Sequence, residues 1–311
     1  MKEQIVLTAP AGGAPEKDRA FLRKQRAKRI VPKVVLYLIL SLLALAWLIP
    51  FLFALSTSFA YQYNRVDGEN VIGIYHKDYN WLWHQSTFDN YIDLFSKYNV
   101  IGGFVNSILY IVAPLFVGVF TSAMAAFGFA RLRFPGKTAM FFTLLSTVLL
   151  PGVITMIPSY ILYATVYNWT NTPLPLIIPG MFGAAMTMFL IRQYFLTLPK
   201  ELEEAAQLDG MGWWGIFLKI ALPLAMPVLI TQIILSFNGM YNDYLGPLLY
   251  VGTVPNLRTL QLILTSIPTQ GYTPYPLMMA GAIVALIPTF VLFAAAQKFF
   301  TEGIVLTGIK G

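Results

Sequence analysis

The chain has 311 residues, of which 57% are hydrophobic and only 11% are charged, and its mean hydropathy is +0.65. A soluble domain carries about 25% charged residues, so this composition excludes an ordinary soluble protein and indicates a chain that folds in a lipid bilayer. The net charge of +7 does not indicate a nucleic-acid partner, because the basic residues gather beside long apolar runs.

Residues 1–33 are expected to form a basic tail that is partly disordered. The tail is rich in Ala, Gly and Pro between residues 9 and 15, and it carries nine Lys or Arg. The apolar run that follows has about 26 residues, which is too long for the core of a signal peptide. We therefore expect a retained first span.

Six apolar runs are long enough to cross a membrane as helices, which takes roughly 20 residues. The runs are continuous and lack the alternation of barrel strands, so the predicted fold class is an all-α membrane protein with six transmembrane helices. Prolines interrupt the runs at several points, which fits helices that bend. They are Pro50, Pro114, Pro151, Pro158, Pro179, Pro227 and Pro288. The predicted spans cover about residues 34–59, 104–128, 138–163, 173–192, 224–245 and 278–300.

The basic residues predict the orientation of the chain. Of the 21 Lys and Arg, all but Arg65, Lys77, Lys97 and Arg258 fall on one side of the predicted spans. The positive-inside rule places that side, with both termini, in the cytoplasm. The predicted domains are the tail 1–33, a membrane domain 34–300 with an outside loop 60–103 and a cytoplasmic loop 195–222, and a cytoplasmic tail 301–311.

The predicted spans lack the groups that ion-driven carriers and membrane enzymes need. No Lys, Arg or His lies at mid-span, and Asp243 stands near the outer end of span five. No pairing of nucleophile with base and no set of metal ligands falls in the spans, and the chain has no cysteine. Transport against a gradient would therefore need energy from another subunit.

Among the loops predicted on the cytoplasmic side, the loop 195–222 is the one with a net negative charge. It holds Lys200 and Lys219 against four acidic residues, a net charge of −2. Pro199 and the acids after it favour a helix start, Gly210 suits the helix end, and a second helix is expected from Gly212 to Leu222, ended by Pro223. An acidic loop beside an anionic leaflet favours docking to a protein, although the pattern alone also fits a solvated helical hairpin. The four acids are Glu201, Glu203, Glu204 and Asp209.

Residues 204–227, EAAQLDGMGWWGIFLKIALPLAMP, have the spacing of the EAA loop of binding-protein-dependent ABC importers. Over residues 34–311 the chain resembles the MalG-like carbohydrate ABC transporter permeases, with two departures: Met211 replaces a small residue, and the loop 60–103 is long. Further resembling segments are residues 104–107, 128–137, 157–160, 241–248 and 303–311.

The resemblance implies a type I ABC importer permease fold in the inner membrane. It implies a sister permease in a heterodimer, two ATPase subunits that hold ATP and Mg²⁺, an extracytoplasmic sugar-binding protein, and contact with membrane lipid. The chain itself has no phosphate-binding loop, so we expect no enzyme activity and no cofactor or metal of its own. The implied ATPase-coupling residues are Glu204, Ala205, Ala206, Asp209 and Gly210, with Glu204 as the charged contact and Gly210 as the turn.

The outer half of span five offers amides, a carboxylate and aromatic rings, which suit sugar hydroxyls and C–H faces. These groups could instead satisfy the backbone or a sister subunit. A permease for another solute, such as a peptide or polyamine, stays open as an alternative, and a secondary carrier or membrane enzyme is more remote. The candidate path residues are Asn238, Tyr241, Asn242, Asp243 and Tyr244.

Overall fold

The computed structural model describes the backbone of residues 16–60, 86–267 and 274–307, and the side chains of residues 32–60, 86–267 and 274–297. The expectations for residues 1–15, 61–85 and 308–311 lie outside the described residues. The described backbone is helical apart from short connections and one isolated bridge between Ala60 and Ser86. The helices are α1 (Glu16–Ser58), α2 (Asp89–Lys97), α3 (Val100–Arg131), α4 (Lys137–Ser146), η1 (Thr147–Leu149), α5 (Gly152–Ile161), η2 (Leu162–Val166), α6 (Leu174–Ile177), η3 (Pro179–Phe182), α7 (Ala185–Thr197), α8 (Glu201–Leu208), α9 (Trp213–Ile216), η4 (Phe217–Ala221), α10 (Leu222–Leu224), α11 (Met226–Tyr241), α12 (Leu245–Val251), η5 (Pro255–Leu257), α13 (Leu260–Thr265) and α14 (Tyr275–Thr307).

The chain divides into two units, Met1–Ser56 and Thr57–Gly311. The first unit consists of most of α1, which is helical from Glu16 onwards, so the basic segment of the tail continues into the first span without a break. The apolar part of α1, Pro32–Ser58, has 27 residues. At about 1.5 Å per residue this length exceeds the roughly 30 Å of a hydrocarbon core.

Four apolar stretches of the described chain are long enough to span the membrane unbent, one of them passing through α6, η3 and α7. The third predicted span is a bent pair of helices, and the fifth is the second member of another bent pair. The pair Lys137–Leu149 and Gly152–Val166 bends by 95°, and the pair Trp213–Leu224 and Met226–Tyr241 bends by 74°. The expected six spans are therefore present when each bent pair counts as one. Pro151 stands at the first bend with an extended backbone, and Pro227 follows the second, because a proline has no N–H to continue the ladder of the preceding helix.

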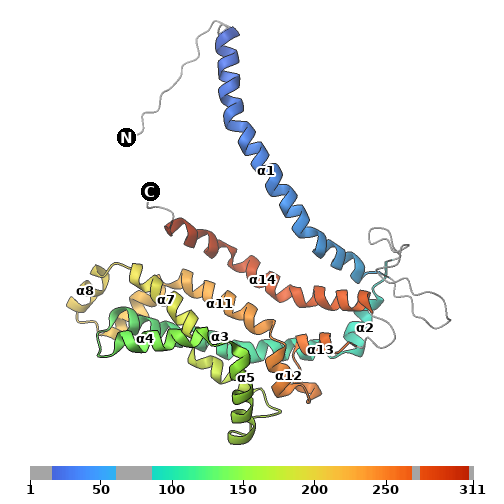
Figure 1. Ribbon diagram of the computed structural model, residues 1–311, viewed down its shortest axis with the longest axis vertical. Helices are drawn as coiled ribbons and strands as arrows, with labels where there is room; N and C mark the ends of the chain where they lie inside the picture. Colours follow the sequence, from blue (N-terminus) through green and yellow to red (C-terminus); the bar gives the residue numbers. More distant parts are fainter. Residues whose placement is uncertain (1–15, 61–85, 268–273, 308–311) are drawn as a thin grey trace, which may run out of the picture. The chain divides into compact units, whose positions relative to one another are not determined.

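Helix α3 is the centre of the second unit. It packs against α7, α11 and α13, while α14 packs against α2, α11 and α13. In Figure 1 the helices α3, α4, α7 and α11 run side by side, with α8 at one end and α2 and α13 at the other. Buried apolar side chains form one cluster at the α8 end and another at the α2 end, which makes α3 the shared wall of both cores.

Polar side chains on the first turns of α3 hold the backbone of the segment around η5. The Asn106 amide donates to the carbonyls of Asn256 and Arg258, at 2.8 and 3.0 Å. The Ser107 hydroxyl accepts from the Leu260 N–H at 2.9 Å, and the Tyr110 hydroxyl donates to Leu257 O. These contacts give backbone groups outside regular helices the partners that they need in an apolar medium.

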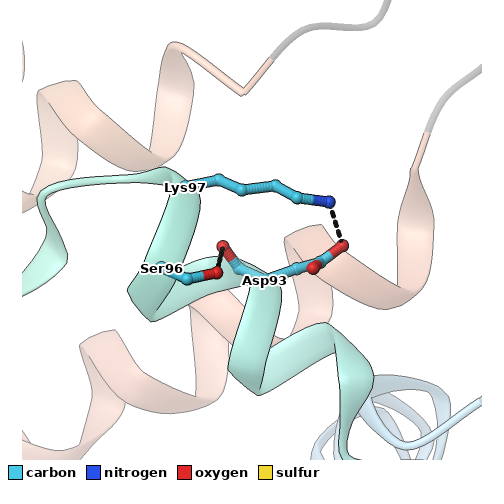
Figure 2. A network of polar contacts seen from close by, with 3 residues as sticks. All are labelled: Asp93, Ser96 and Lys97. Carbon is cyan, nitrogen blue, oxygen red and sulfur yellow. Dashed lines mark hydrogen bonds and ion pairs between the residues drawn. The ribbon is translucent and has the colours of Figure 1, made fainter.

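Helix α2 is a short helix that packs against α14 and α3 and leaves several of its side chains exposed. Its Lys97 ammonium reaches the carboxylate of Asp93 at 2.6 Å, and the Ser96 hydroxyl donates to Asp93 O (Figure 2). An exposed pair of this spacing contributes only about 0.3–0.5 kcal/mol. The buried contacts decide the position of α2, since Leu94 is fully buried and the Asn90 amide donates to the carbonyls of Ser58 and Ala60.

A close approach between α3 and η3 generates the first prediction. A Cβ on Gly118 would meet the carbonyl oxygen of Gly180, whereas a Cβ on Gly128 in the same helix would find its nearest atom 4.0 Å away. We expect Gly118→Ala to lower the free energy of unfolding by about 1–3 kcal/mol through overpacking. Gly128→Ala should be neutral or slightly stabilising, because alanine favours a helix. Thermal unfolding of the purified protein in detergent measures both, and equal melting temperatures would refute the close contact.

Candidate functional site

Helix α8 forms the first half of the acidic loop. It begins at Glu201, with Lys200 before it and three acidic side chains in its first turn, where carboxylates complement the partial positive charge of the helix start. Pro199 therefore precedes the helix rather than lying in its first turn. The predicted helix at the start of the loop is present, beginning at Glu201.

Gly210 ends α8 in a left-handed conformation with φ +81°. The N–H of Met211 donates to Ala206 O at 2.9 Å, and the N–H of Gly210 donates to Gln207 O at 3.0 Å. These two bonds form a Schellman motif, which satisfies carbonyls that the helix end would leave unpaired. Glycine suits the position because a left-handed backbone strains other residues by roughly 1–2 kcal/mol. The turn expected at Gly210 is present.

The side chains of α8 divide into an inward and an outward face. Glu203 and Ala206 are buried, and the residues on the opposite side of the helix are exposed to solvent. Leu208 is 90% exposed, which is unusual for a leucine and marks the outward face as a surface that a partner could cover. The outward face, as the term is used below, consists of Glu201, Glu204, Ala205 and Leu208.

A buried ion pair fastens α8 to the end of α3. The Nε of Arg131 lies 2.5 Å from a carboxylate oxygen of Glu203, with the two side chains only 3% and 9% exposed. The N–H of that Nε is not aligned for a hydrogen bond, so the contact is an ion pair. Arg131 also donates from Nη2 to Leu198 O at 2.8 Å, which fixes the chain just before α8. One guanidinium thus positions both the start and the inward face of the helix.

The segment after α8 packs its aromatic residues into the same core. Phe217 is buried, and its ring lies 5.3 Å from the ring of Phe127 on α3. The expected second helix is present, but Pro223 does not end it: α9 passes into the π turn η4 and then into α10, which contains the proline. The N–H of Leu222 closes the π turn by donating to Phe217 O, and the helix continues past the proline to Leu224.

The structure distributes the predicted coupling residues over both faces of α8 and its end. Ala206 is buried, whereas Glu204, Ala205, Asp209 and Gly210 are exposed. Residue patterns missed the part played by Glu203, because its partner Arg131 lies far away in the sequence. The exposed Leu208 was also missed. A helical wheel of residues 201–208 that placed Ala206 inward would have put Leu208 outward.

The five residues proposed for a substrate path do not converge on one cavity. Asn238 and Asn242 are exposed and bond to each other, since the Asn242 amide donates to the Asn238 side-chain oxygen at 2.8 Å. Asp243 accepts from the Gly246 N–H at 3.2 Å, and Tyr244 is exposed. Only Tyr241 is buried, with 2% exposure, and its ring stacks on Phe237 at 5.3 Å.

Tyr241 and Asp243 line a cavity of about 70 Å³ together with Thr259, which sequence reasoning did not single out. The hydroxyls of Tyr241 and Thr259 have no hydrogen-bond partner among the described residues. Ligand pockets span roughly 300–1,000 Å³, so this cavity in its present form is too small for a sugar. Its two buried hydroxyls suit water, which needs polar partners and about 30 Å³ per molecule.

The Arg131–Glu203 pair generates the second prediction. Glu203→Ala leaves a buried guanidinium without its counter-charge, and we expect it to cost about 3–5 kcal/mol and to reduce the yield of folded protein. The neighbouring Glu204→Ala, on the exposed face, should change the stability by less than about 0.5 kcal/mol. Thermal unfolding of both variants in detergent makes the comparison. Equal stability would contradict the buried pair, and the double variant Arg131→Met with Glu203→Leu should recover stability because no charge stays unpaired.

The match to a known protein family lies within the second unit. Residues 100–305 match the family described as the inner membrane component of binding-protein-dependent transport systems. The chain is 31% identical over 230 residues to the probable ABC transporter permease protein YurM of Bacillus subtilis, covering 74% of this chain and 75% of that protein. It is 31% identical over 226 residues to the arabinooligosaccharides transport system permease protein AraQ of Halalkalibacterium halodurans, covering 72% and 80%.

The fold matches a solved structure over almost the whole chain. The crystal structure of a bacterial ABC transporter that imports the acidic polysaccharide alginate superposes with a TM-score of 0.71 and 21% identity, covering 93% of this chain and 100% of the other. The all-α fold, the apolar spans and the family match agree. The chain belongs to the family of inner membrane components of binding-protein-dependent transport systems, and it is a permease subunit of an ABC transporter rather than an enzyme.

Proposed function

We propose that this chain is one of two different permease subunits in an ATP-driven importer of a sugar or oligosaccharide, and that α8 docks on an ATPase subunit through its outward face. The partner ATPases would hold ATP and Mg²⁺, and an extracytoplasmic binding protein would deliver the solute. Membership of the family supports ATPase and binding-protein partners in general.

The observation that carries the docking proposal is the construction of α8. Its inward face is anchored by a buried ion pair and its end by a glycine-based cap, so the helix is held in place before any partner binds. Its outward face nevertheless exposes Leu208 beside two carboxylates and a small alanine. A rigid helix with an exposed apolar residue at the end of an acidic face suits insertion into a groove of another protein.

Rigidity matters for coupling because a flexible loop would absorb a movement of the ATPase instead of transmitting it. The Arg131 guanidinium connects α8 directly to α3, and α3 extends through both cores of the second unit. A displacement of α8 would therefore act on the helix against which α7, α11 and α13 pack. This continuous packing supports a route from the docking face to the spans.

A sugar or oligosaccharide is the solute class that the relatives favour, because AraQ is named for the transport of arabinooligosaccharides. The motif segments outside the loop, such as residues 104–107 and 241–248, point the same way. A peptide or polyamine permease remains the second candidate. Identifying the ligand of the binding protein that acts with this chain separates the two.

The docking proposal predicts a specific loss of coupling. In the assembled complex, Glu204→Lys reverses a charge on the outward face, and Gly210→Pro removes the left-handed cap, since proline holds φ near −65°. We expect both variants to insert in the membrane and to lose ATPase stimulation by the loaded binding protein. Asp93→Lys on α2 is the matched control, because it makes the same charge reversal on an exposed helix at the other end of the second unit. Normal stimulation of ATPase activity in the Glu204→Lys complex would refute the docking role of α8.

The proposed substrate path predicts a separate effect at Tyr241. Tyr241→Phe removes a hydroxyl that has no partner among the described residues, so the melting temperature should hardly change. If the hydroxyl meets the solute when the path opens, uptake of the radiolabelled solute should fall about three- to tenfold, the range expected for one hydrogen bond. Tyr194→Phe, which deletes the hydroxyl bonded to Leu224 O, serves as the control. Unchanged uptake in Tyr241→Phe would remove this residue from the path.

A further inference from the structure

A second, larger cavity lies between α3, α4 and α7, away from the substrate-path residues. Its volume is about 320 Å³, which falls within the range of ligand pockets. Lys137 and Thr138 from the first turn of α4 and Arg192 from α7 provide its polar side, while phenylalanines such as Phe142 and Phe189 provide its apolar side. The cavity therefore has the chemistry for a ligand with an anionic part and a hydrocarbon part.

The positive charges on this cavity are not neutralised within the described part of the chain. Neither Lys137 nor Arg192 takes part in an ion pair among the described side chains, whereas the nearby Arg131 is paired with Glu203. The Lys137 ammonium donates to Leu132 O at 2.8 Å, and Arg133 and Arg192 both lie within electrostatic range of it. Three cations thus share a small region in which none of them forms an ion pair with a described side chain.

Backbone and ring contacts hold Arg192 at the wall of the cavity. Its Nε donates to Phe129 O at 3.0 Å, and its guanidinium carbon lies 4.2 Å from the centre of the Phe141 ring. These contacts occupy one N–H and one face of the guanidinium. The planar group keeps further N–H donors, whose fork geometry matches the oxygens of a phosphate.

The apolar side of the cavity lies along α4, which begins the third predicted span. Phe142 is 61% exposed, and it follows Lys137 by five positions in α4, the first segment of the third span. Leu145 lies almost one turn further along the same helix and also lines the cavity. A molecule with its charged end at Lys137 can therefore extend its hydrocarbon part along α4.

We propose that this cavity binds an anionic phospholipid, with the headgroup phosphate between Lys137 and Arg192 and an acyl chain against Phe142 and Leu145. Charge complementarity favours an anionic lipid such as phosphatidylglycerol over a zwitterionic one. The proposal depends on the membrane location of the chain and not on the docking of α8. Phe129, Phe141 and Phe189 belong to the same cluster of packed side chains as Ala206, so the lipid would stabilise the core on which α8 rests.

A photoactivatable phosphatidylglycerol tests the proposal in the assembled transporter reconstituted in phosphatidylcholine nanodiscs. After illumination, mass spectrometry should find the label on peptides of α4 and α7. Each lysine or arginine near a membrane surface contributes about 1 kcal/mol to binding of anionic lipid, or roughly a fivefold change in affinity. We expect Lys137→Gln to reduce labelling about fivefold, and the double variant Lys137→Gln with Arg192→Gln to reduce it about 25-fold.

Controls separate the lipid site from general charge effects and from misfolding. Lys219→Gln removes one exposed cation outside the cavity and should leave labelling of α4 unchanged. Lys137→Gln keeps the contacts of Arg192, and an unchanged melting temperature would show that the variant is folded. Unlabelled phosphatidylglycerol should compete, whereas matched phosphatidylcholine and inorganic phosphate should not.

Three results would overturn the proposal. Equal competition by phosphatidylcholine would show that the cavity does not select lipids by charge. Competition by inorganic phosphate would show that the apolar side of the cavity is not needed for binding. The absence of label from α4 in the assembled complex would show that the sister permease, rather than a lipid, covers the cavity.

Discussion

The ion pair between Arg131 and Glu203 is the contact on which the arrangement of the second unit's α8 end depends. Both side chains are almost fully buried, so neither charge could stay there without the other. Through Nη2 the same guanidinium binds Leu198 O, and the pair thereby connects the last turn of α3 to the whole acidic loop. A loop that would otherwise move freely in water becomes a fixed extension of α3, the central helix of the second unit.

The membrane imposes a matching constraint on the rest of the chain. Backbone groups at helix breaks have no water to bind, so serine, threonine, asparagine and tyrosine side chains supply their partners. Ser122 illustrates this, because its hydroxyl accepts from the Ala184 N–H at 3.1 Å, where the chain turns between η3 and α7. Glycines at contact points such as Gly118 and Gly180 let the backbones approach closely, as is common between helices in lipid.

Charge gives the α8 end three features with different roles: a buried ion pair, a cationic cavity and an acidic outward face. Where Arg131 meets Glu203, the charge is cancelled inside the protein and the result is mechanical connection. Where Lys137, Arg133 and Arg192 gather, the described side chains form no ion pair with them, and an anionic lipid would complete the site. The outward face of α8 is acidic in turn, which discourages contact with an anionic leaflet and leaves it available for a protein partner.

The sequence by itself determined the helical membrane fold, the approximate spans, the family resemblance and the position of α8, because hydropathy, proline and glycine are read from neighbouring residues. It placed Gly210 at the helix end for the same local reason. Only the tertiary structure decided that Glu203 is buried against Arg131, that Leu208 is exposed, where and by how much the helices bend, and that Tyr241 lies apart from Asn238 and Asn242. The burial of Glu203 depends on a partner far away in the chain, and no local pattern encodes which distant side chains meet.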